Sequence, residues 1–347
     1  MSDIGLIGSY TPDGGVGLSS YRVDGADGTV ERLDGATERD PSFLALHPSG
    51  EFLVVVNEVD DGALTTYAVD PGTGELSRID RAATGEAGPC HVAVDATGSY
   101  AVAAHYVGGS VTVHPLAGDG SVGDPTDVIR HEGSSVHPER QTDPHPHSAT
   151  FGPGDEFVYV PDLGTDRVHA YAFDAADGRL RPASTTGVDL HDEAGPRHAA
   201  VHPDGEVVYV LNELDATLAA FELDEEGRLS RTATVEGVPG GAPEGTTAAD
   251  VHVHPSGDWL YASNRGHDSI TRFDLRDDVR RPSRASVTPT GGEWPRNFAL
   301  SPDGDRLFAL NQRSDSIVPF AVSRSDGELT RDGEPIAVDS PVCLQFL

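Results

Sequence analysis

The sequence contains no lysine. All 24 of its basic residues are arginine, and they stand against 57 acidic residues for a formal net charge of −33. Contacts with a nucleic-acid backbone need a cationic surface, which this composition does not supply. A membrane-surface helix needs a basic amphipathic stretch, and the chain lacks one. We therefore expect neither nucleic acid nor a membrane as a partner.

Cysteine and long apolar runs are scarce as well. Two cysteines in 347 residues cannot build a disulfide framework, and we expect Cys90 and Cys343 to be small core residues. No apolar stretch approaches the roughly 20 residues of a membrane span, and the first residues lack the pattern of a signal peptide. A surface rich in Asp and Glu but free of Lys is typical of a halophilic protein that stays soluble in brine. The expected location is a salt-rich cytoplasm.

Aromatic residues make up 6% of the chain, whereas glycine (40) and proline (25) are abundant. Together these two residue types form about a fifth of the sequence, which is high for a helical protein and low for a disordered one. The composition therefore predicts a turn-rich, all-β protein.

A sixteen-residue pattern recurs six times. It consists of a short apolar strand, an x-Pro-x-Gly turn, and a second strand that ends in a polar residue. The copies begin at Phe43, His91, His147, His198, Asp250 and Asn297. Each is followed by a third alternating strand and by a fourth strand after an Asp/Gly turn. Four strands in each unit of about 50 residues predict the blades of a β-propeller.

The two ends of the chain supply a seventh blade. The segment from Pro341 to Leu347 matches a first strand alone, and the N-terminal segment before the first copy matches strands two, three and four. We therefore predict a seven-bladed propeller with four-stranded blades, a single domain over residues 1–347, whose last blade is closed by both termini. Closure of this kind leaves no exposed sheet edge. The alternative, two separate domains, has no linker to support it.

Polar residues are expected to meet at one mouth of the propeller channel. In each blade the start of the first strand and the end of the second lie at the same end of a hairpin, where opposed residues share a face. Counting from Gly205 sets Arg197 opposite Glu213, and counting from Gly257 sets Arg265 opposite Ala249. The polar residues predicted at this mouth are His147, Arg197, His198, Glu213, Asp250, Arg265, Arg296 and Asn297.

Several arginines are predicted at this one mouth, although the chain as a whole is strongly acidic. The guanidinium fork binds carboxylate or phosphate in bidentate geometry, so the mouth is a candidate site for an anion. The alternative is that Arg197 and Glu213 form an ion pair that locks a blade, with the other polar residues solvated at the rim.

Four segments carry a resemblance to a known family: GPRHAAVHPDGEVVYVLNEL (195–214), PHSATFGPGDEFVYVP (146–161), AADVHVHPSGDWLYASNR (248–265) and WPRNFALSPDG (294–304). The chain resembles the seven-bladed propeller lactonases, which include the bacterial propeller type of 6-phosphogluconolactonase and are related to fungal carboxy-cis,cis-muconate cyclase. The resemblance implies hydrolysis of an anionic sugar lactone. By resemblance, the catalytic or substrate-binding positions of the family are His147, Arg197, Glu213 and Arg265, and Arg296 matches a further arginine of the pattern.

Lactone hydrolysis needs an activated water, a stabilised oxyanion and a proton for the leaving alkoxide. We predict His147 and Glu213 as the acid/base pair, in an order that the sequence leaves open, with the charge of Arg197 lowering the pKa of Glu213. Arg197 completes the catalytic set. The predicted substrate-binding residues are Arg265, Arg296, His198, Asp250 and Asn297.

The sequence predicts no metal and no cofactor. Four histidines between His131 and His147 are spaced by 6, 8 and 2 residues, which matches no standard zinc pattern. The Asn and Asp residues at strand ends resemble calcium ligands, but asparagine there also caps the turn. P-loop, G-x-G-x-x-G and G-x-S-x-G motifs are missing.

Two alternative functions remain open. One is a non-catalytic propeller that binds a protein partner, which would need an exposed apolar patch. The other is a lactonase or cyclase that acts on gluconolactone or carboxymuconolactone. We expect a monomer or a weak homodimer.

Overall fold

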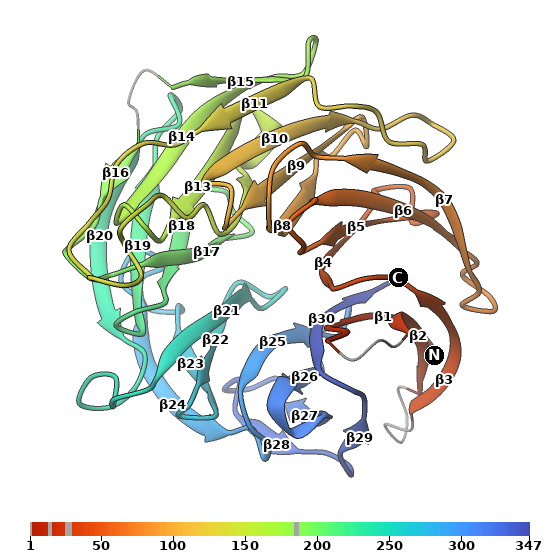
Figure 1. The fold of residues 1–347 in the computed structure, drawn as a ribbon. Coiled ribbons are helices and arrows are strands. Elements are labelled where there is room, and N and C mark those ends of the chain that lie inside the picture. The colour runs from red at the N-terminus through yellow and green to blue at the C-terminus, as the bar shows by residue number, and fades with distance from the viewer. Residues whose placement is uncertain (1, 13–15, 25–29, 184–186) are drawn as a thin grey trace.

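The computed structural model describes residues 2–12, 16–24, 30–183 and 187–347. These residues form seven antiparallel sheets around a central axis (Figure 1). Two short 3₁₀ turns, η1 (Pro153–Asp155) and η2 (Gln312–Ser314), accompany the strands. No helix in the described part of the chain is long and apolar enough to cross a membrane. The prediction of an all-β, seven-bladed propeller is confirmed.

Six blades follow the chain in order, and within each blade the chain runs from the innermost strand outward. The first three are β4 (Pro41–Leu46), β5 (Phe52–Asn57), β6 (Ala63–Val69) and β7 (Leu76–Ala83); β8 (Pro89–Val94), β9 (Tyr100–His105), β10 (Ser110–Pro115) and β11 (Asp127–Arg130); and β12 (Thr150–Phe151), β13 (Phe157–Asp162), β14 (Arg167–Asp174) and β15 (Arg179–Pro182), with β16 (Val188–Asp189) also on β14. The next three are β17 (Pro196–Val201), β18 (Val207–Asn212), β19 (Thr217–Leu223) and β20 (Leu229–Glu236); β21 (Thr247–Val253), β22 (Trp259–Arg265), β23 (Ser269–Asp274) and β24 (Ser283–Pro289); and β25 (Pro295–Leu300), β26 (Arg306–Asn311), β27 (Ser316–Val322) and β28 (Leu329–Arg331), with β29 (Ile336–Ala337) also on β27.

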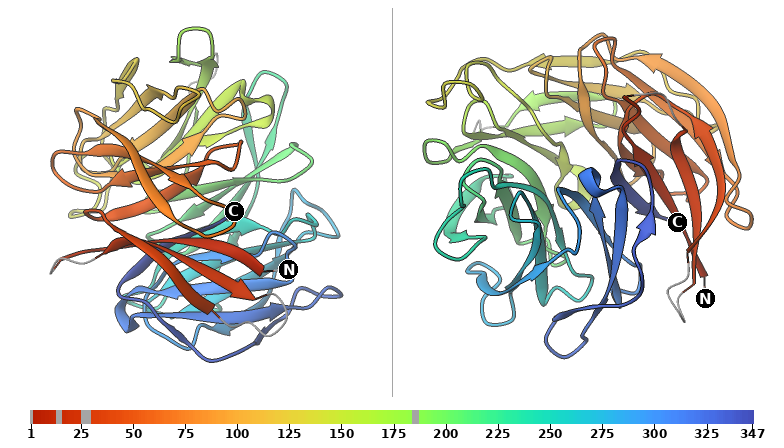
Figure 2. Two further views of the ribbon diagram at one scale, coloured as in Figure 1. Left: turned by 90° about the vertical axis from the view of Figure 1, so that its right-hand side faces the viewer. Right: turned by 60° about the horizontal axis from the view of Figure 1, so that its bottom comes forward.

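Both ends of the chain build the seventh blade. Its strand order is β3-β2-β1-β30, with β1 at Ser2–Ser9, β2 at Gly17–Asp24, β3 at Val30–Thr37 and β30 at Pro341–Phe346. The last strand pairs antiparallel with the first, and the two lie side by side in Figures 1 and 2. The predicted closure, with the C-terminal strand innermost, is confirmed. It pairs an edge that would otherwise be open to another chain.

The apolar core lies between neighbouring blades. Tyr209 and Leu211 of β18, for example, pack with Leu260 and Phe273 of the next blade, and all four are buried. Middle strands such as β18 are buried along their whole length, whereas the outer strand β20 alternates between exposed and half-buried residues. This gradient explains why the middle strands read as continuous apolar runs in the sequence.

A β-bulge marks the start of most inner strands. In β17, Pro196 pairs with Asn212 and His198 pairs with Leu211, so Arg197 is the extra, unpaired residue. The predicted opposition of Arg197 and Glu213 was therefore wrong in register, because a count from the turn glycine assumes an unbroken ladder. A bulge re-aims the side chain at its position, and here it turns Arg197 toward the channel mouth.

The same effect corrects two other predicted positions. Thr247, and not Ala249, pairs with Arg265, because β21 carries a bulge between Ala248 and Val251. The copy predicted to begin at His147 begins one residue later.

The one-residue shift changes the equivalences among the blades. The pairing of β12 with β13 makes His147 equivalent to Arg197 of the next blade, rather than to His198. The prediction aligned the turn glycines, but in this turn Asp155 (φ 57°) takes the left-handed conformation that Gly205 (φ 78°) has in the next blade. A non-glycine residue in this region is uncommon but is tolerated best by Asp and Asn.

Candidate active site

A cavity of about 300 Å³ opens at one mouth of the channel. It is lined by Glu58, Tyr106, Arg140, His147, Arg197, Glu213, Arg265 and Arg296. Five of these residues were predicted at the mouth from the sequence. Glu58, Tyr106 and Arg140 were not.

Two recurring backbone positions supply seven of the eight lining residues. The first is the bulged position after the proline that begins an inner strand, occupied by His147, Arg197 and Arg296. The second is the end of the neighbouring hairpin strand, occupied by Glu58, Tyr106, Glu213 and Arg265. Both positions recur at the same end of the channel in successive blades. The side chains there point into the cavity and not into the blade core, so they can differ between blades without a change of fold. The Pro-x signal for the first position is present in the sequence.

Glu213 is the centre of the ionic network. Its Oε2 atom lies 3.0 Å from Nη1 of Arg197 and 3.0 Å from Nη2 of Arg265, and its Oε1 atom lies 2.6 Å from Nη2 of Arg140. The carboxylate is buried, with 3% of its side chain exposed. Three guanidinium partners occupy most of the lone-pair sites of this buried carboxylate, so it holds the arginines in fixed directions.

His147 lies against the same network. Its Nε2 atom contacts Nη1 of Arg197 and lies 3.9 Å from Oε2 of Glu213. On the other side of the ring, Nδ1 is 3.6 Å from Sγ of Cys90. The imidazole is therefore within reach of any molecule held between these charged groups.

Burial and charge set the protonation of the central groups. Burial raises the pKa of Glu213, but the arginine charges, led by Arg265, outweigh it and hold the pKa well below its usual value. Burial, followed by the charge of Arg197, lowers the pKa of His147 well below its usual value. The carboxylate is therefore ionised and the imidazole neutral near pH 7. Burial raises the pKa of the Cys90 thiol to about 12, which makes it unreactive.

A second ionic group borders the cavity around Arg296. Its Nη2 atom is 3.5 Å from Oε2 of Glu58, and its guanidinium lies 5.1 Å from the centroid of the Tyr10 ring. The Tyr10 hydroxyl donates to the same glutamate oxygen at 2.6 Å. Arg296 thus shares its one carboxylate partner with a hydroxyl, and its contact is longer than those at Glu213.

Arg140 reaches the cavity from a loop outside the repeat. This loop, residues 131–147, is the His-rich loop of the sequence. The Arg140 side chain is 35% exposed, and its Nη2 atom also donates to the Tyr106 hydroxyl at 3.2 Å. The Tyr106 ring stacks on His145, with 4.3 Å between centroids. Repeat spacing could not identify Arg140, because the loop has no counterpart in the other blades.

Three of the predicted substrate-binding residues lie next to the cavity but do not line it. His198, Asp250 and Asn297 each follow the bulged position by one residue, so they face the channel one step deeper. They bond to one another: Nδ1 of His198 is 2.8 Å from Oδ1 of Asp250, and Nδ2 of Asn297 donates to Oδ2 of Asp250 at 2.5 Å. Their expected place at the mouth was wrong by one residue, since the bulge was not foreseen.

Two of the strand-end asparagines bond to the third strand of their own blades. Asn57 accepts from the Thr65 hydroxyl at 2.8 Å, and Asn212 donates to the Thr217 hydroxyl at 2.8 Å. These bonds join the second strand to the third, which agrees with the turn-capping role named above as the alternative to calcium binding. Among the described residues, one group of metal-ligand side chains lies close together, His131, Asp162 and His169. It does not line the cavity.

The charges of the cavity do not balance. Four arginines and two glutamates leave two positive charges, since His147 is neutral. In a chain of net charge −33, this local surplus favours an anion with about two negative charges.

Comparison with known proteins places the chain in a family. The family model described as "Lactonase, 7-bladed beta-propeller" matches residues 4–346. The 6-phosphogluconolactonase of Bacillus subtilis is 31% identical, over 99% of this chain and 98% of the relative. The 6-phosphogluconolactonase of Formosa agariphila is 28% identical, over 98% of each. The structure of the periplasmic gluconolactonase PpgL of Pseudomonas aeruginosa has a TM-score of 0.96 and 32% identity, over 100% of this chain and 99% of that one.

Proposed function

The chain belongs to the seven-bladed β-propeller lactonase family, and from this we propose that it hydrolyses 6-phosphogluconolactone to 6-phosphogluconate. It is thus a sugar lactonase, as its named relatives are. The observation that carries the choice of substrate is the surplus of two positive charges in the cavity. A phosphate monoester carries about −1.5 to −2 at pH 7, which matches that surplus.

The proton transfers are assigned to His147. The contact between Nε2 of His147 and Nη1 of Arg197 opens when the lactone binds. The freed Nε2 of the neutral imidazole then takes a proton from a water molecule, and the water oxygen attacks the carbonyl carbon of the lactone. The carbonyl electron pair moves to its oxygen, which becomes the oxyanion. When this intermediate collapses, the ring C–O bond breaks and His147 returns the proton to the leaving alkoxide. The product is the open-chain acid, which then ionises.

The arginines divide between the reacting carbonyl and the phosphate. Arg197 and Arg265 converge with His147 on Glu213, so they are placed to stabilise the oxyanion. Arg296 and Arg140 lie on either side of that centre and keep unshared donors. We assign these two to the phosphate, as bidentate or paired contacts.

Glu213 supports this arrangement as a fixed anion. Its two oxygens already accept from Arg140, Arg197 and Arg265, so a proton taken up there would weaken all three ion pairs at once. We therefore assign both proton transfers to His147 and a positioning role to Glu213, in place of the acid/base pair expected from the sequence.

Gluconolactone is the second candidate substrate. The structural neighbour PpgL is described as a gluconolactonase, and its likeness covers the whole chain. An unphosphorylated lactone would leave the charge of Arg296 and Arg140 unmatched. The two substrates can therefore be separated by arginine variants.

The test compares both lactones on wild type, Arg140→Ala, Arg296→Ala and the control Arg181→Ala, whose side chain is 60% exposed on an outer strand. Loss of one charge-assisted contact is worth about 1.5–3 kcal/mol, so kcat/KM for the phosphorylated lactone should fall by about tenfold or more in both site variants. The value for gluconolactone should change much less. Equal losses on both lactones would contradict the phosphate assignment, and so would an effect of Arg181→Ala.

We also propose that the protein works in a salt-rich cytoplasm as a monomer or weak homodimer. The charge of −33 without lysine supports the salt requirement. In the described residues, the large apolar side chains that stand exposed are Val107 and Val136, which is too little for an extended apolar interface. Unfolding at a series of KCl concentrations and sedimentation analysis test these two points.

A further inference from the structure

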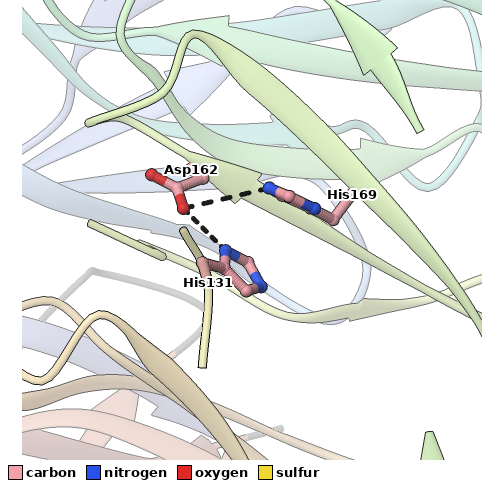
Figure 3. Close-up of side chains that lie close together, drawn as sticks. All are labelled: His131, Asp162 and His169. Carbon is pink, nitrogen blue, oxygen red and sulfur yellow. Dashed lines mark hydrogen bonds and ion pairs between the residues drawn. The ribbon is translucent and has the colours of Figure 1, made fainter. Parts of the chain in front are cut away.

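Three metal-ligand side chains lie together where two blades meet. His131 directly follows β11, Asp162 ends β13, and His169 lies within β14 (Figure 3). Nδ1 of His131 is 2.6 Å from Oδ2 of Asp162, and Nε2 of His169 is 4.0 Å from the same oxygen. One ligand atom from each residue lies within 4.8 Å of the others. The two closest members have 1% or less of their side chains exposed.

The equivalent place in another blade shows an ordinary hydrogen-bonded set. There Asn57 stands in the position of Asp162, Thr65 in that of His169, and Glu38 in that of His131. The Thr65 hydroxyl donates to Asn57 at 2.8 Å, and the Asn57 amide donates to Glu38 at 2.8 Å. Every pair in that set has a donor and an acceptor.

The His131 blade replaces this set with three metal-ligand types and leaves one atom unpaired. Nε2 of His169 is buried, and none of the residues that the structure describes forms a hydrogen bond with it. Buried polar atoms are nearly always paired, so an exception calls for a missing partner. In Figure 3 the unpaired nitrogen is directed toward the Asp162 carboxylate, on the side where His131 also lies.

Other groups hold two of the three side chains, His131 and Asp162, from behind. The Tyr171 hydroxyl lies 2.9 Å from Nε2 of His131, which leaves Nδ1 free to act as a ligand when Nε2 carries the proton. The second oxygen of Asp162 accepts the backbone N–H groups of His145 at 2.8 Å and Gly164 at 3.0 Å. Metal-bound His and Asp side chains in proteins are commonly oriented by outer hydrogen bonds of this kind.

We propose that His131, Asp162 and His169 bind one divalent metal ion of the zinc class. Two imidazoles and one carboxylate suit Zn²⁺, with a water as the fourth ligand. Ligand distances of about 2.0–2.2 Å place the ligand atoms of a tetrahedron about 3.3–3.6 Å apart. The 2.6 Å contact must open and the 4.0 Å contact must close to reach that spacing. Small rotations of the side chains achieve both, and the ion takes the place of the proton between His131 and Asp162.

The ion is structural, and it fixes the loop that carries Arg140. His131 begins that loop, and Asp162 holds the backbone of His145 near its other end. An ion that joins His131 to Asp162 therefore pins both ends while Arg140 contacts Glu213 at 2.6 Å. The histidine spacing within the loop could not reveal this site, because two of the three ligands come from the β13–β14 hairpin.

The test loads chelated, full-length protein with Zn²⁺ alone and, separately, with Co²⁺. It is run in about 1 M KCl, where the Debye length of about 3 Å screens the acidic surface. After dialysis, wild type should retain about one equivalent of zinc, and its melting temperature should rise by a few degrees because the ion binds the folded state. Bound Co²⁺ should show the intense visible bands of a tetrahedral site.

Three variants make the assignment specific. His169→Thr restores the residue type that pairs with Asn57 in the other blade, so it should fold while losing the retained ion, the thermal shift and the cobalt bands. His131→Asn should lose them too. His191→Asn is the control, because His191 forms a more exposed pair with Asp215 at 2.6 Å; it should bind like wild type. A wild type that retains no ion would overturn the proposal, as would equal retention by His169→Thr. The wild-type result alone decides the matter if a variant fails to fold.

Discussion

Replacing Glu213 with Gln separates a positioning role from a proton-transfer role. The change keeps the shape of the side chain and removes the charge that three guanidinium groups share at 2.6–3.0 Å. Breaking a buried ion cluster on one side costs about 3–5 kcal/mol of stability. Gln keeps one acceptor oxygen, so we expect the lower end of that range and a protein that still folds in high salt.

The catalytic loss follows from the arginines. Arg197 and Arg265 lose the anion that directs them toward the oxyanion, and a misplaced oxyanion donor costs about 10²–10³ in kcat. KM for the phosphorylated lactone should change less than kcat, because Arg140 loses its partner Glu213 but Arg296, the other arginine assigned to the phosphate, keeps Glu58. Initial rates of proton release, corrected for spontaneous hydrolysis, measure both constants.

The pH profile and a conservative variant decide the interpretation. If Glu213 positions the arginines, Glu213→Asp should recover part of the lost kcat, and the pH dependence of Glu213→Gln should keep the shape of the wild type. Near wild-type kcat in folded Glu213→Gln would refute the positioning argument. Loss of the acidic limb of the profile in this variant would make Glu213 the base in place of His147.

Three further predictions concern protonation and the deeper channel. Because burial lowers the pKa of His147 well below its usual value, wild-type kcat should stay level as the pH falls through about 6.5; a pH–rate profile shows this. Burial lowers the pKa of His105 to about 3 and that of His198 to about 4. As the pH falls below about 6.5, these two histidines take up protons in the unfolded chain but stay neutral in the folded protein. Each should therefore lower the free energy of unfolding by about 1.4 kcal/mol per pH unit. His252 partly offsets this loss, because its partner Asp250 raises its pKa despite burial. Urea unfolding at constant salt measures that slope. Asp250→Asn weakens the bonds from His198 and His252 and should cost about 3 kcal/mol of stability with a smaller effect on kcat, as paired unfolding and rate measurements would show.

Each of these has a contrary outcome. A half-titration of kcat near pH 6.5 would mean that His147 is not held neutral by its surroundings. Constant stability down to pH 5 would mean that the buried histidines gain protons in the folded state. In Asp250→Asn, the fall in kcat can be converted to an activation free energy and compared with the loss in the free energy of unfolding. If the catalytic loss is the larger, Asp250 has the substrate-binding role predicted from the sequence.

The repeat pattern made the fold predictable, including the closing blade. Apolar strands and turn residues recur in every copy, so the number of blades and the match between the two ends could be counted. The register at the channel could not be counted, because the bulge after Pro196 adds a residue that no pattern of hydrophobicity records. That single residue separates Arg197, which lines the cavity, from His198, which does not.

The remaining site residues were hidden for a different reason. Glu58 and Tyr106 occupy the same backbone position as Glu213, but in the sequence only a resemblance or a charge pair identifies that position, and neither applies to these two residues. Arg140 lies in a loop without a counterpart in the other blades, and its contact with Glu213 depends on how that loop folds back over the mouth. Long-range loop contacts of this kind leave no periodic signal.

We propose that the protein hydrolyses an anionic lactone in the Arg-lined cavity with His147 as the base. This is tested by the rate of 6-phosphogluconolactone hydrolysis by purified wild type and His147→Gln, relative to the spontaneous reaction in the same high-salt buffer. We expect clear acceleration by the wild type, a fall in kcat of about 10²–10⁴ in the variant, and a nearly unchanged KM. A wild type no faster than buffer, or a folded His147→Gln as fast as the wild type, would contradict it.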